Sequence, residues 1–223
     1  MTTKAERSRG MPRRTAPVAT RSSRTPLVIG AAVVGFILIA AVIALAFGGT
    51  SGGGALSEPA TQAVGVTGDP LPAYGDGNDP AIGSAIPTIT GTDLAGEPIS
   101  IGPEDGPMAI VLLAHWCSHC QAEVPLLVDY LASTGMPDGV RLVGISTSIN
   151  EAQPNYPPSA WFEREGWTVP TMNDDANSRA LAALGMNSFP AFVFVDADGR
   201  VVSRTTGEIP IQTFDQIVNS IAP

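Results

Sequence analysis

Seven uninterrupted apolar residues, MAIVLLA at 108–114, run straight into the hexapeptide HWCSHC at 115–120. An apolar run without alternation predicts a β-strand that is buried on both faces. Downstream of the hexapeptide, apolar residues recur with the spacing of one buried helix face, at Val124, Leu127, Val128 and Leu131. The cysteines of this chain are therefore expected at the junction between a central strand and the first turn of a helix.

The segments around this junction predict one domain of strands and helices. Further strands are expected at 141–147, 191–196 and 200–205, helices at 159–165, 177–184 and 211–221, and a hairpin at 89–101. Strands and helices alternate first and a hairpin comes late, which predicts a three-layer α/β domain over 81–223.

A stretch of 21 residues, 27–47, contains no charged side chain. About 20 apolar residues cross a hydrocarbon core of about 30 Å, so we expect a transmembrane anchor over 27–47. The residues before it carry seven basic side chains against Glu6 alone. The positive-inside rule then places 1–26 in the cytoplasm as a basic tail and the rest of the chain outside the cytoplasm. The alternative is a cleaved signal peptide, whose apolar region is usually only about 7–15 residues long.

The part of the chain after the basic tail is strongly acidic. The whole chain has a net charge of −9 and residues 1–26 contribute seven positive charges and one negative charge, so the remainder is more negative than the whole. Nucleic acids are bound by basic surfaces, and we therefore do not expect a nucleic acid as a partner.

Residues 48–80 join the expected anchor to the expected domain. They are rich in Gly, Pro, Ser, Thr and Asp, and their apolar residues show no period of 2 or 3.6. This composition predicts a flexible linker that lets the domain move near a membrane surface. Docking of its short apolar cluster, Leu71, Pro72 and Tyr74, on the domain is the alternative.

The hexapeptide holds the only two cysteines and the only two histidines of the chain. A closed zinc site needs four ligands, usually as two pairs from separate places, and no second pair exists here. Haem attachment needs a histidine directly after the second cysteine, where Gln121 stands. A structural disulfide between Cys117 and Cys120 would close a very small loop and stabilise little. The zinc site and the structural disulfide remain as weaker alternatives to a redox-active pair.

A redox-active pair explains the position of the cysteines as well as their spacing. The first turn of a helix favours a thiolate, because its N–H groups and dipole point toward the sulfur. A thiolate attacks disulfides, and a second thiol resolves the mixed disulfide that forms. We expect Cys117 to be the nucleophile and Cys120, one turn further in, to be the resolving thiol.

The segments MAIVLLAHWCSHCQAEVP and NSFPAFVFVDADGRVV resemble the thioredoxin superfamily, most closely its membrane-anchored TlpA/ResA-like thiol–disulfide oxidoreductases. The resemblance covers about residues 81–223. It implies a thioredoxin-like three-layer domain with a central mixed sheet, a redox dithiol at Cys117 and Cys120, and a cis proline at Pro190. It implies no metal and no organic cofactor.

Three further residues acquire expected roles from the resemblance. Glu123 stands where this branch has a glutamate beside the dithiol, a carboxylate able to exchange protons with the thiols; a solvated first-turn glutamate is the alternative. Trp116 is expected to pack beside Cys117. His119 resembles the histidine of DsbA-type oxidants, which stabilises the thiolate of the first cysteine. His115 has no family role and is expected to be partly exposed.

The resemblance implies an enzyme that exchanges disulfides with exported proteins, in cytochrome c maturation or oxidative protein folding, together with a membrane or extracytoplasmic redox partner. Two alternatives stay open. A peroxiredoxin-type thiol peroxidase would place a threonine three residues before its cysteine, where Ala114 stands. A non-catalytic binding module would keep the fold and use the cysteines as a structural disulfide.

Overall fold

The computed structural model describes residues 63–75 and 77–223. Eight strands lie at Gly65–Thr67 (β1), Thr88–Asp93 (β2), Pro98–Ile101 (β3), Met108–Leu113 (β4), Arg141–Ser146 (β5), Thr171–Asn173 (β6), Ala191–Val195 (β7) and Val201–Thr206 (β8). Helices lie at Ser118–Ser133 (α2), Pro158–Arg164 (α3), Arg179–Ala183 (α4) and Ile211–Ser220 (α5), with a short 3-10 turn at Pro103–Asp105. The expected strands, helices and hairpin are all present, with shifts of a few residues at their ends.

The strands form one mixed sheet in the order β1-β2-β6-β5-β4-β7-β8, and β3 also pairs with β2. β4 and β5 are parallel, with Met108 opposite Arg141, whereas β4 and β7 are antiparallel, with Met108 opposite Val195. The carboxyl end of β4, which carries the cysteines, therefore lies beside the amino end of β7. This pairing places residues 117 and 190 at the same end of the sheet.

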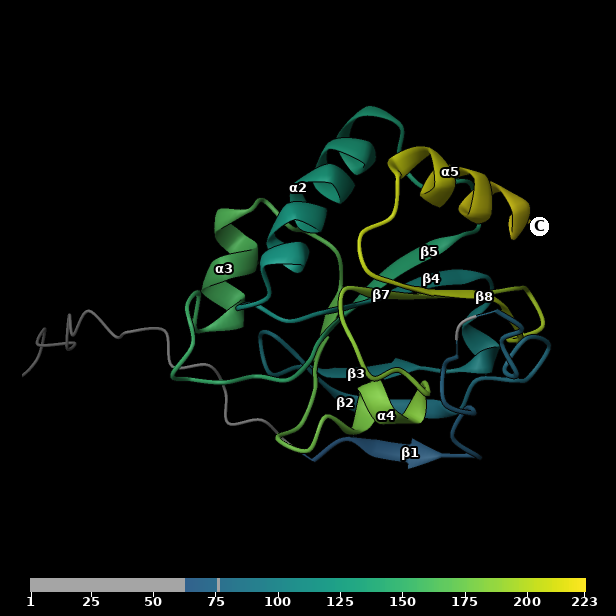
Figure 1. Ribbon diagram of the computed structural model, residues 1–223, viewed down its shortest axis with the longest axis horizontal. Helices are drawn as coiled ribbons and strands as arrows, with labels where there is room; N and C mark the ends of the chain where they lie inside the picture. The colour runs from purple at the N-terminus through teal and green to yellow at the C-terminus, as the bar shows by residue number, and fades with distance from the viewer. Residues whose placement is uncertain (1–62, 76) are drawn as a thin grey trace, which may run out of the picture. The chain divides into compact units, whose positions relative to one another are not determined.

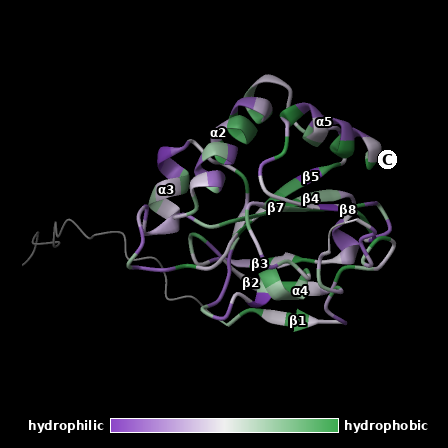
Figure 2. Cartoon of the chain, viewed as in Figure 1, coloured by the Kyte–Doolittle hydropathy of each residue, from purple (hydrophilic) through white to green (hydrophobic). Residues whose placement is uncertain are grey.

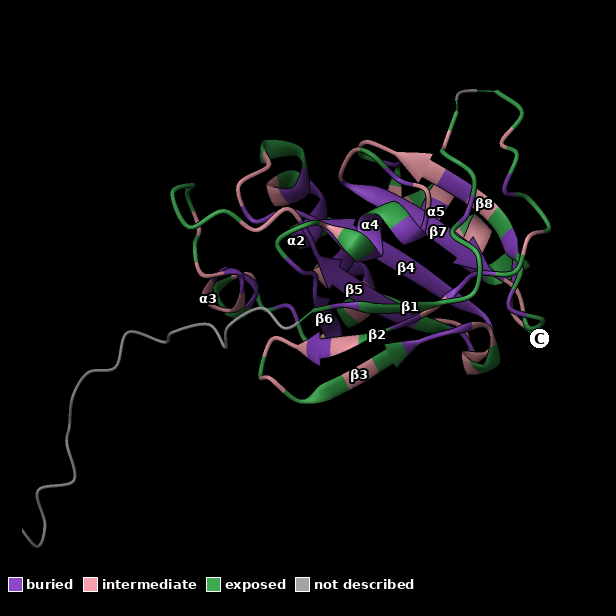
Figure 3. Cartoon of the chain, turned by 90° about the horizontal axis from the view of Figure 1, so that it is seen from below, coloured by how far each residue is buried: buried purple, intermediate pink, exposed green. Residues whose placement is uncertain are grey.

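The sheet is covered on both faces, which explains why β4 is apolar throughout. Helices α2, α3 and α5 lie over one face and α4 lies at the other (Figure 1). Alternate β4 residues belong to two separate cores: Ala109, Val111 and Leu113 to the α2/α5 side and Met108, Ile110 and Leu112 to the α4 side. Hydrophobic residues line the central strands (Figure 2), and β4 and β7 are buried whereas β1 and β3 are largely exposed (Figure 3).

Residues 63–75 and 77–80 belong to the domain, so the prediction of a flexible linker over all of 48–80 is wrong for this part. β1 pairs with β2, and Val64 and Leu71 are buried in the α4-side core. The amide of Leu71 donates to Ala183 O at 2.9 Å and that of Tyr74 donates to Gly185 O at 2.7 Å. Apart from β1, this segment contains no helix or strand. Its few apolar residues therefore pack on the domain without the sequence period of a regular element.

A buried ion pair fixes the end of this segment. Arg204 on β8 is 4% exposed and its Nε donates to Asp79 Oδ2 at 2.9 Å. Its Nη1 also donates to the carbonyls of Pro72 and Leu184, at 3.0 and 2.7 Å. The hydrogen bond from Arg204 lowers the pKa of Asp79 below its ordinary value. At Gly185, where φ is +67°, an added Cβ would lie 2.2 Å from Pro72 O, so a glycine is required for this approach.

The expected anchor at 27–47, the basic tail at 1–26 and residues 48–62 lie outside the described residues. Within the part of the chain that the structure describes, no helix is long and apolar enough to span a bilayer.

Candidate active site

Cys117 is the N-cap residue of α2 and stands at the end of the loop that follows β4. It has an extended backbone conformation, with φ −77° and ψ 122°, and its carbonyl accepts the Gln121 amide at 3.0 Å. The side chain is half-buried, and its thiol lies 3.6 Å from the carbonyl oxygen of Phe189. Its sulfur makes no capping hydrogen bond to the backbone of the first helical turn.

Cys120 has the opposite environment. Its side chain is completely buried, and its sulfur accepts the Ala114 amide at 3.4 Å. Burial is the main cause that raises the pKa of the Cys120 thiol; the Ala114 amide lowers it, and the neighbouring Cys117 and Glu123 raise it by smaller amounts. Both cysteines are free thiols in the structure. The accessible member of the pair is Cys117, and Cys120 keeps its proton until another group removes it.

Glu123 lies one turn after Cys120 and is completely buried. Neither carboxylate oxygen has a hydrogen-bond partner. Burial raises the pKa of Glu123 to about 7; the Ile209 amide lowers it without reaching hydrogen-bond geometry, and the Glu208 carboxylate raises it again. The alternative of a solvated first-turn glutamate is therefore wrong, because the side chain points into the core between α2 and the segment before α5.

Pro190 completes the same end of the sheet. The Phe189–Pro190 peptide bond is cis, as the resemblance implied. The carbonyl of Phe189 faces the Cys117 thiol. The carbonyl of Pro190 accepts a hydrogen bond from the Gly207 amide at 2.8 Å. The loop after β8 is thereby joined to the proline loop.

Trp116 directly precedes Cys117 and is half-buried. Its ring meets the Phe189 ring edge to face, with centroids 5.3 Å apart. Its Nε1 donates to the carbonyl of Ser148 at 2.8 Å. The indole is thus fixed between the proline loop and the loop after β5, and Ser148 is a contact that no motif in the sequence indicated.

His119 does not make the contact that the sequence suggested. Its Nδ1 lies 2.6 Å from Glu208 Oε1, and no hydrogen bond joins it to Cys117. Glu208 is separated from His119 by 89 residues, so sequence spacing could not identify it. The His119 ring is hydrogen-bonded to the loop before α5.

The expectation that His115 is partly exposed is wrong: its side chain is completely buried. Its Nδ1 lies 2.8 Å from Pro154 O, and its Nε2 lies 3.3 Å from the Asn150 amide. A carbonyl only accepts and an amide only donates, so Nδ1 carries the hydrogen and the ring is neutral. The Asn155 side chain also donates to the His115 carbonyl at 3.1 Å. His115 therefore joins the end of β4 to the loop after β5.

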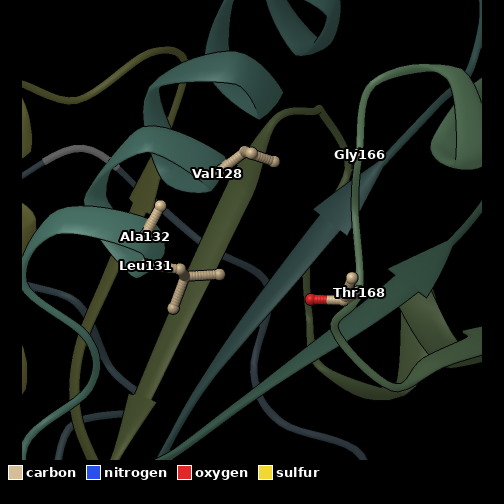
Figure 4. A pocket seen from close by; sticks show the side chains of 5 residues that line it. All are labelled: Val128, Leu131, Ala132, Gly166 and Thr168. Carbon is tan, nitrogen blue, oxygen red and sulfur yellow. The ribbon is translucent and has the colours of Figure 1, made fainter.

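A small hollow of about 200 Å³ lies further along α2 (Figure 4). It is lined by Val128, Leu131, Ala132, Gly166 and Thr168. None of these residues is ionisable or nucleophilic enough to take part in exchange chemistry, and the hollow is separate from the cysteine pair.

Comparison with known proteins agrees with this geometry. The family model described as Redoxin matches residues 81–221. The chain is 26% identical over 144 residues to the thiol-disulfide oxidoreductase ResA of Geobacillus thermodenitrificans, covering 64% of this chain and 79% of that protein. It is 25% identical over 144 residues to ResA of Geobacillus kaustophilus, with the same coverage.

Solved structures agree with the topology. A thioredoxin family thiol:disulfide interchange protein from Chlorobium tepidum superposes with a TM-score of 0.52 at 23% identity, covering 66% of this chain and 99% of that one. The thioredoxin domain of a Bacteroides vulgatus thiol-disulfide oxidoreductase gives 0.51 at 22% identity, covering 63% and 98%. The described domain therefore has a thioredoxin-like fold.

Proposed function

This chain is a thiol–disulfide oxidoreductase of the redoxin family, and from that premise we propose that it acts outside the cytoplasm and exchanges disulfides with exported proteins. One observation carries the proposal. The two thiols at the start of α2 differ in accessibility, with Cys117 half-buried opposite the cis-proline loop and Cys120 completely buried. This asymmetry separates an attacking thiol from a resolving thiol.

In the reducing direction, the Cys117 thiolate attacks one sulfur of a client disulfide. A bond forms between Cys117 and that sulfur, the client disulfide breaks, and the other client sulfur leaves as a thiolate. Cys120 then loses its proton and attacks the sulfur of Cys117. The Cys117–Cys120 disulfide forms, the mixed disulfide breaks, and the second client sulfur leaves. The reverse sequence oxidises a client dithiol.

In this scheme Glu123, one turn after Cys120 on α2, accepts the proton of Cys120; its carboxylate already acts electrostatically on that thiol. Because burial holds its pKa at about 7, the carboxyl group is present in both protonation states near neutral pH. A general base is most effective when its pKa lies near the working pH. Trp116 and Phe189 flank Cys117 and provide the half-buried apolar surface against which a client segment would lie.

The extracytoplasmic location rests on the sequence alone. The apolar stretch 27–47 and the basic residues before it support a single anchor, with the redox domain on the outer side of the membrane. Exported proteins form disulfides in such compartments, which supports them as clients, with a second redox protein there to restore the dithiol.

The alternatives have less support. A peroxiredoxin would need a threonine at the position of Ala114. The backbone amide of Ala114 donates a hydrogen bond to the Cys120 sulfur. The zinc alternative needs both histidines, but the two ring nitrogens of His115 are occupied by Pro154 and Asn150, and His119 is bound to Glu208.

Trapping of clients tests the proposal. Cys120→Ser in the full-length chain should accumulate mixed disulfides with exported proteins, because the resolving thiol is missing. The mixed disulfides are measured on non-reducing gels after blocking free thiols with acid and an alkylating agent. The matched control is Cys117→Ser, which should trap nothing because it lacks the attacking thiol. Equal trapping by the two variants would contradict the roles assigned to the cysteines.

A further inference from the structure

The loop of residues 207–210, between β8 and α5, contacts two parts of the active site at once. The Gly207 amide donates to the carbonyl of Pro190 at 2.8 Å. The Ile209 side chain is buried, and its amide acts on the Glu123 carboxylate. Glu208 lies between these two residues, so its backbone is held in place by the contacts of Gly207 and Ile209.

Glu208 reaches from this loop to the first turn of α2. Its Oε1 lies 2.6 Å from Nδ1 of His119, the residue directly before Cys120 and two after Cys117. Nδ1 is the donor in this bond, because a carboxylate only accepts. The two side chains are 44% and 69% exposed. The pair therefore forms at the rim of the active site, in contact with solvent.

We propose that Glu208 is a positioning residue for the dithiol: it holds the His119 ring away from Cys117 and offsets its charge, which keeps the cysteine pair more reducing than an unrestrained histidine would. An imidazolium close to a thiolate stabilises it. Stabilising the thiolate stabilises the reduced protein, which makes the disulfide a stronger oxidant. The inference rests on the proposed function, since it concerns the equilibrium of the same cysteine pair.

The exposure of the pair limits the size of the effect. Ion pairs in contact with solvent couple weakly, because water and salt screen them. We therefore expect the loss of the Glu208 charge to lower the equilibrium constant for oxidation by glutathione disulfide about fivefold, which corresponds to about 20 mV.

The experiment measures this constant for the purified full-length chain. In the reaction, one reduced chain and one glutathione disulfide give one oxidised chain and two glutathione molecules. Glu208→Gln removes the charge and keeps a hydrogen-bond acceptor for His119, and it should lower the constant about fivefold. Glu208→Asp keeps the charge and should stay within about twofold of the wild type. Thermal unfolding of each variant checks that the fold is intact.

Asp198→Asn is the matched control for the loss of one negative charge. Asp198 is exposed in the turn between β7 and β8. That turn follows Val195, which pairs with Met108 at the start of β4. It lies at the end of the sheet opposite to the cysteines, so this change should leave the constant unaltered.

Repeating Glu208→Gln in a His119→Gln background tests the route of the effect. With no imidazole to release, the substitution should change the constant by less than about twofold. A fivefold change in both backgrounds would overturn the inference, because Glu208 would then act by its charge alone. An unchanged constant in Glu208→Gln would overturn it as well, while the proposed function would stand. A wild-type chain that never equilibrates with glutathione would overturn both.

Discussion

Replacing Glu123 by glutamine should change how the stability of the domain depends on pH. The carboxyl group is completely buried and has no hydrogen bond. Burial raises its pKa from an ordinary value of 4.5 to about 7. Below pH 4.5 the group is protonated in both the folded and the unfolded chain, and it has no effect on the pH dependence. Between 4.5 and 7 the folded chain holds a proton that the unfolded chain has lost, so stability falls as pH rises.

The size of this loss follows from the two pKa values. Each pH unit between them corresponds to about 1.4 kcal/mol, so the full loss is about 3 kcal/mol, and about 2.5 kcal/mol of it falls between pH 5 and pH 8. Glutamine does not titrate. The free energy of unfolding of the wild type should therefore fall by about 2.5 kcal/mol more than that of Glu123→Gln over this range.

Urea unfolding of the reduced full-length chain, followed by tryptophan fluorescence, measures the difference. All three tryptophans, Trp116, Trp161 and Trp167, lie in the described domain, so the signal reports on this domain. Glu97→Gln, in the exposed turn between β2 and β3, is the control and should follow the wild type. Parallel curves for the wild type and Glu123→Gln from pH 5 to pH 8 would refute the assignment of a protonated buried carboxyl group, and with it the role of Glu123 as proton acceptor for Cys120.

Two other substitutions test contacts that hold the domain together. Arg204→Met leaves the partly buried Asp79 carboxylate without its cation, so it should lower the free energy of unfolding by about 1.5–3 kcal/mol and speed chymotrypsin cleavage after Tyr74. Arg200→Met, at an exposed arginine, should do neither. Equal cleavage of the two variants would argue against the Asp79–Arg204 ion pair as the contact that holds this segment on the domain. His115→Phe removes the partners of Pro154 O and the Asn150 amide and should lower the free energy of unfolding by about 1–3 kcal/mol. The exposed His119→Phe should change it by less than about 0.5 kcal/mol, and an unchanged urea midpoint in His115→Phe would show that this link is dispensable.

The central strands and α2 could be predicted from the sequence because their signals are local. MAIVLLA is buried on both faces, and its residues are divided between two cores, as a continuous apolar run predicts. The position of the cysteines at the start of α2 could be predicted because the apolar strand and the helical spacing on either side of them are local patterns. The cis bond before Pro190 was predicted from the family resemblance.

The remaining features depend on contacts between distant parts of the chain. The apolar cluster Leu71, Pro72 and Tyr74 allowed docking as an alternative, but Asp79 and Arg204 are 125 residues apart, so the ion pair that holds this segment has no local signal in its Gly- and Pro-rich composition. The burial of His115 depends on residues 35 and 39 positions away. The direction of His119 depends on Glu208, for which no local pattern exists.

The docking of residues 63–75 and 77–80 also determines how far from its anchor the cysteine pair can reach. On the proposed topology, only residues 48–62 remain between the anchor and the domain, 15 residues in place of the 33 in 48–80. Fully extended, such chains reach at most about 50 Å and about 110 Å. Since accessible volume grows with the cube of the reach, the shorter connection confines the domain to roughly a tenth of the volume. At equal numbers of molecules, the local concentration of Cys117 toward clients emerging at the membrane would be about tenfold higher.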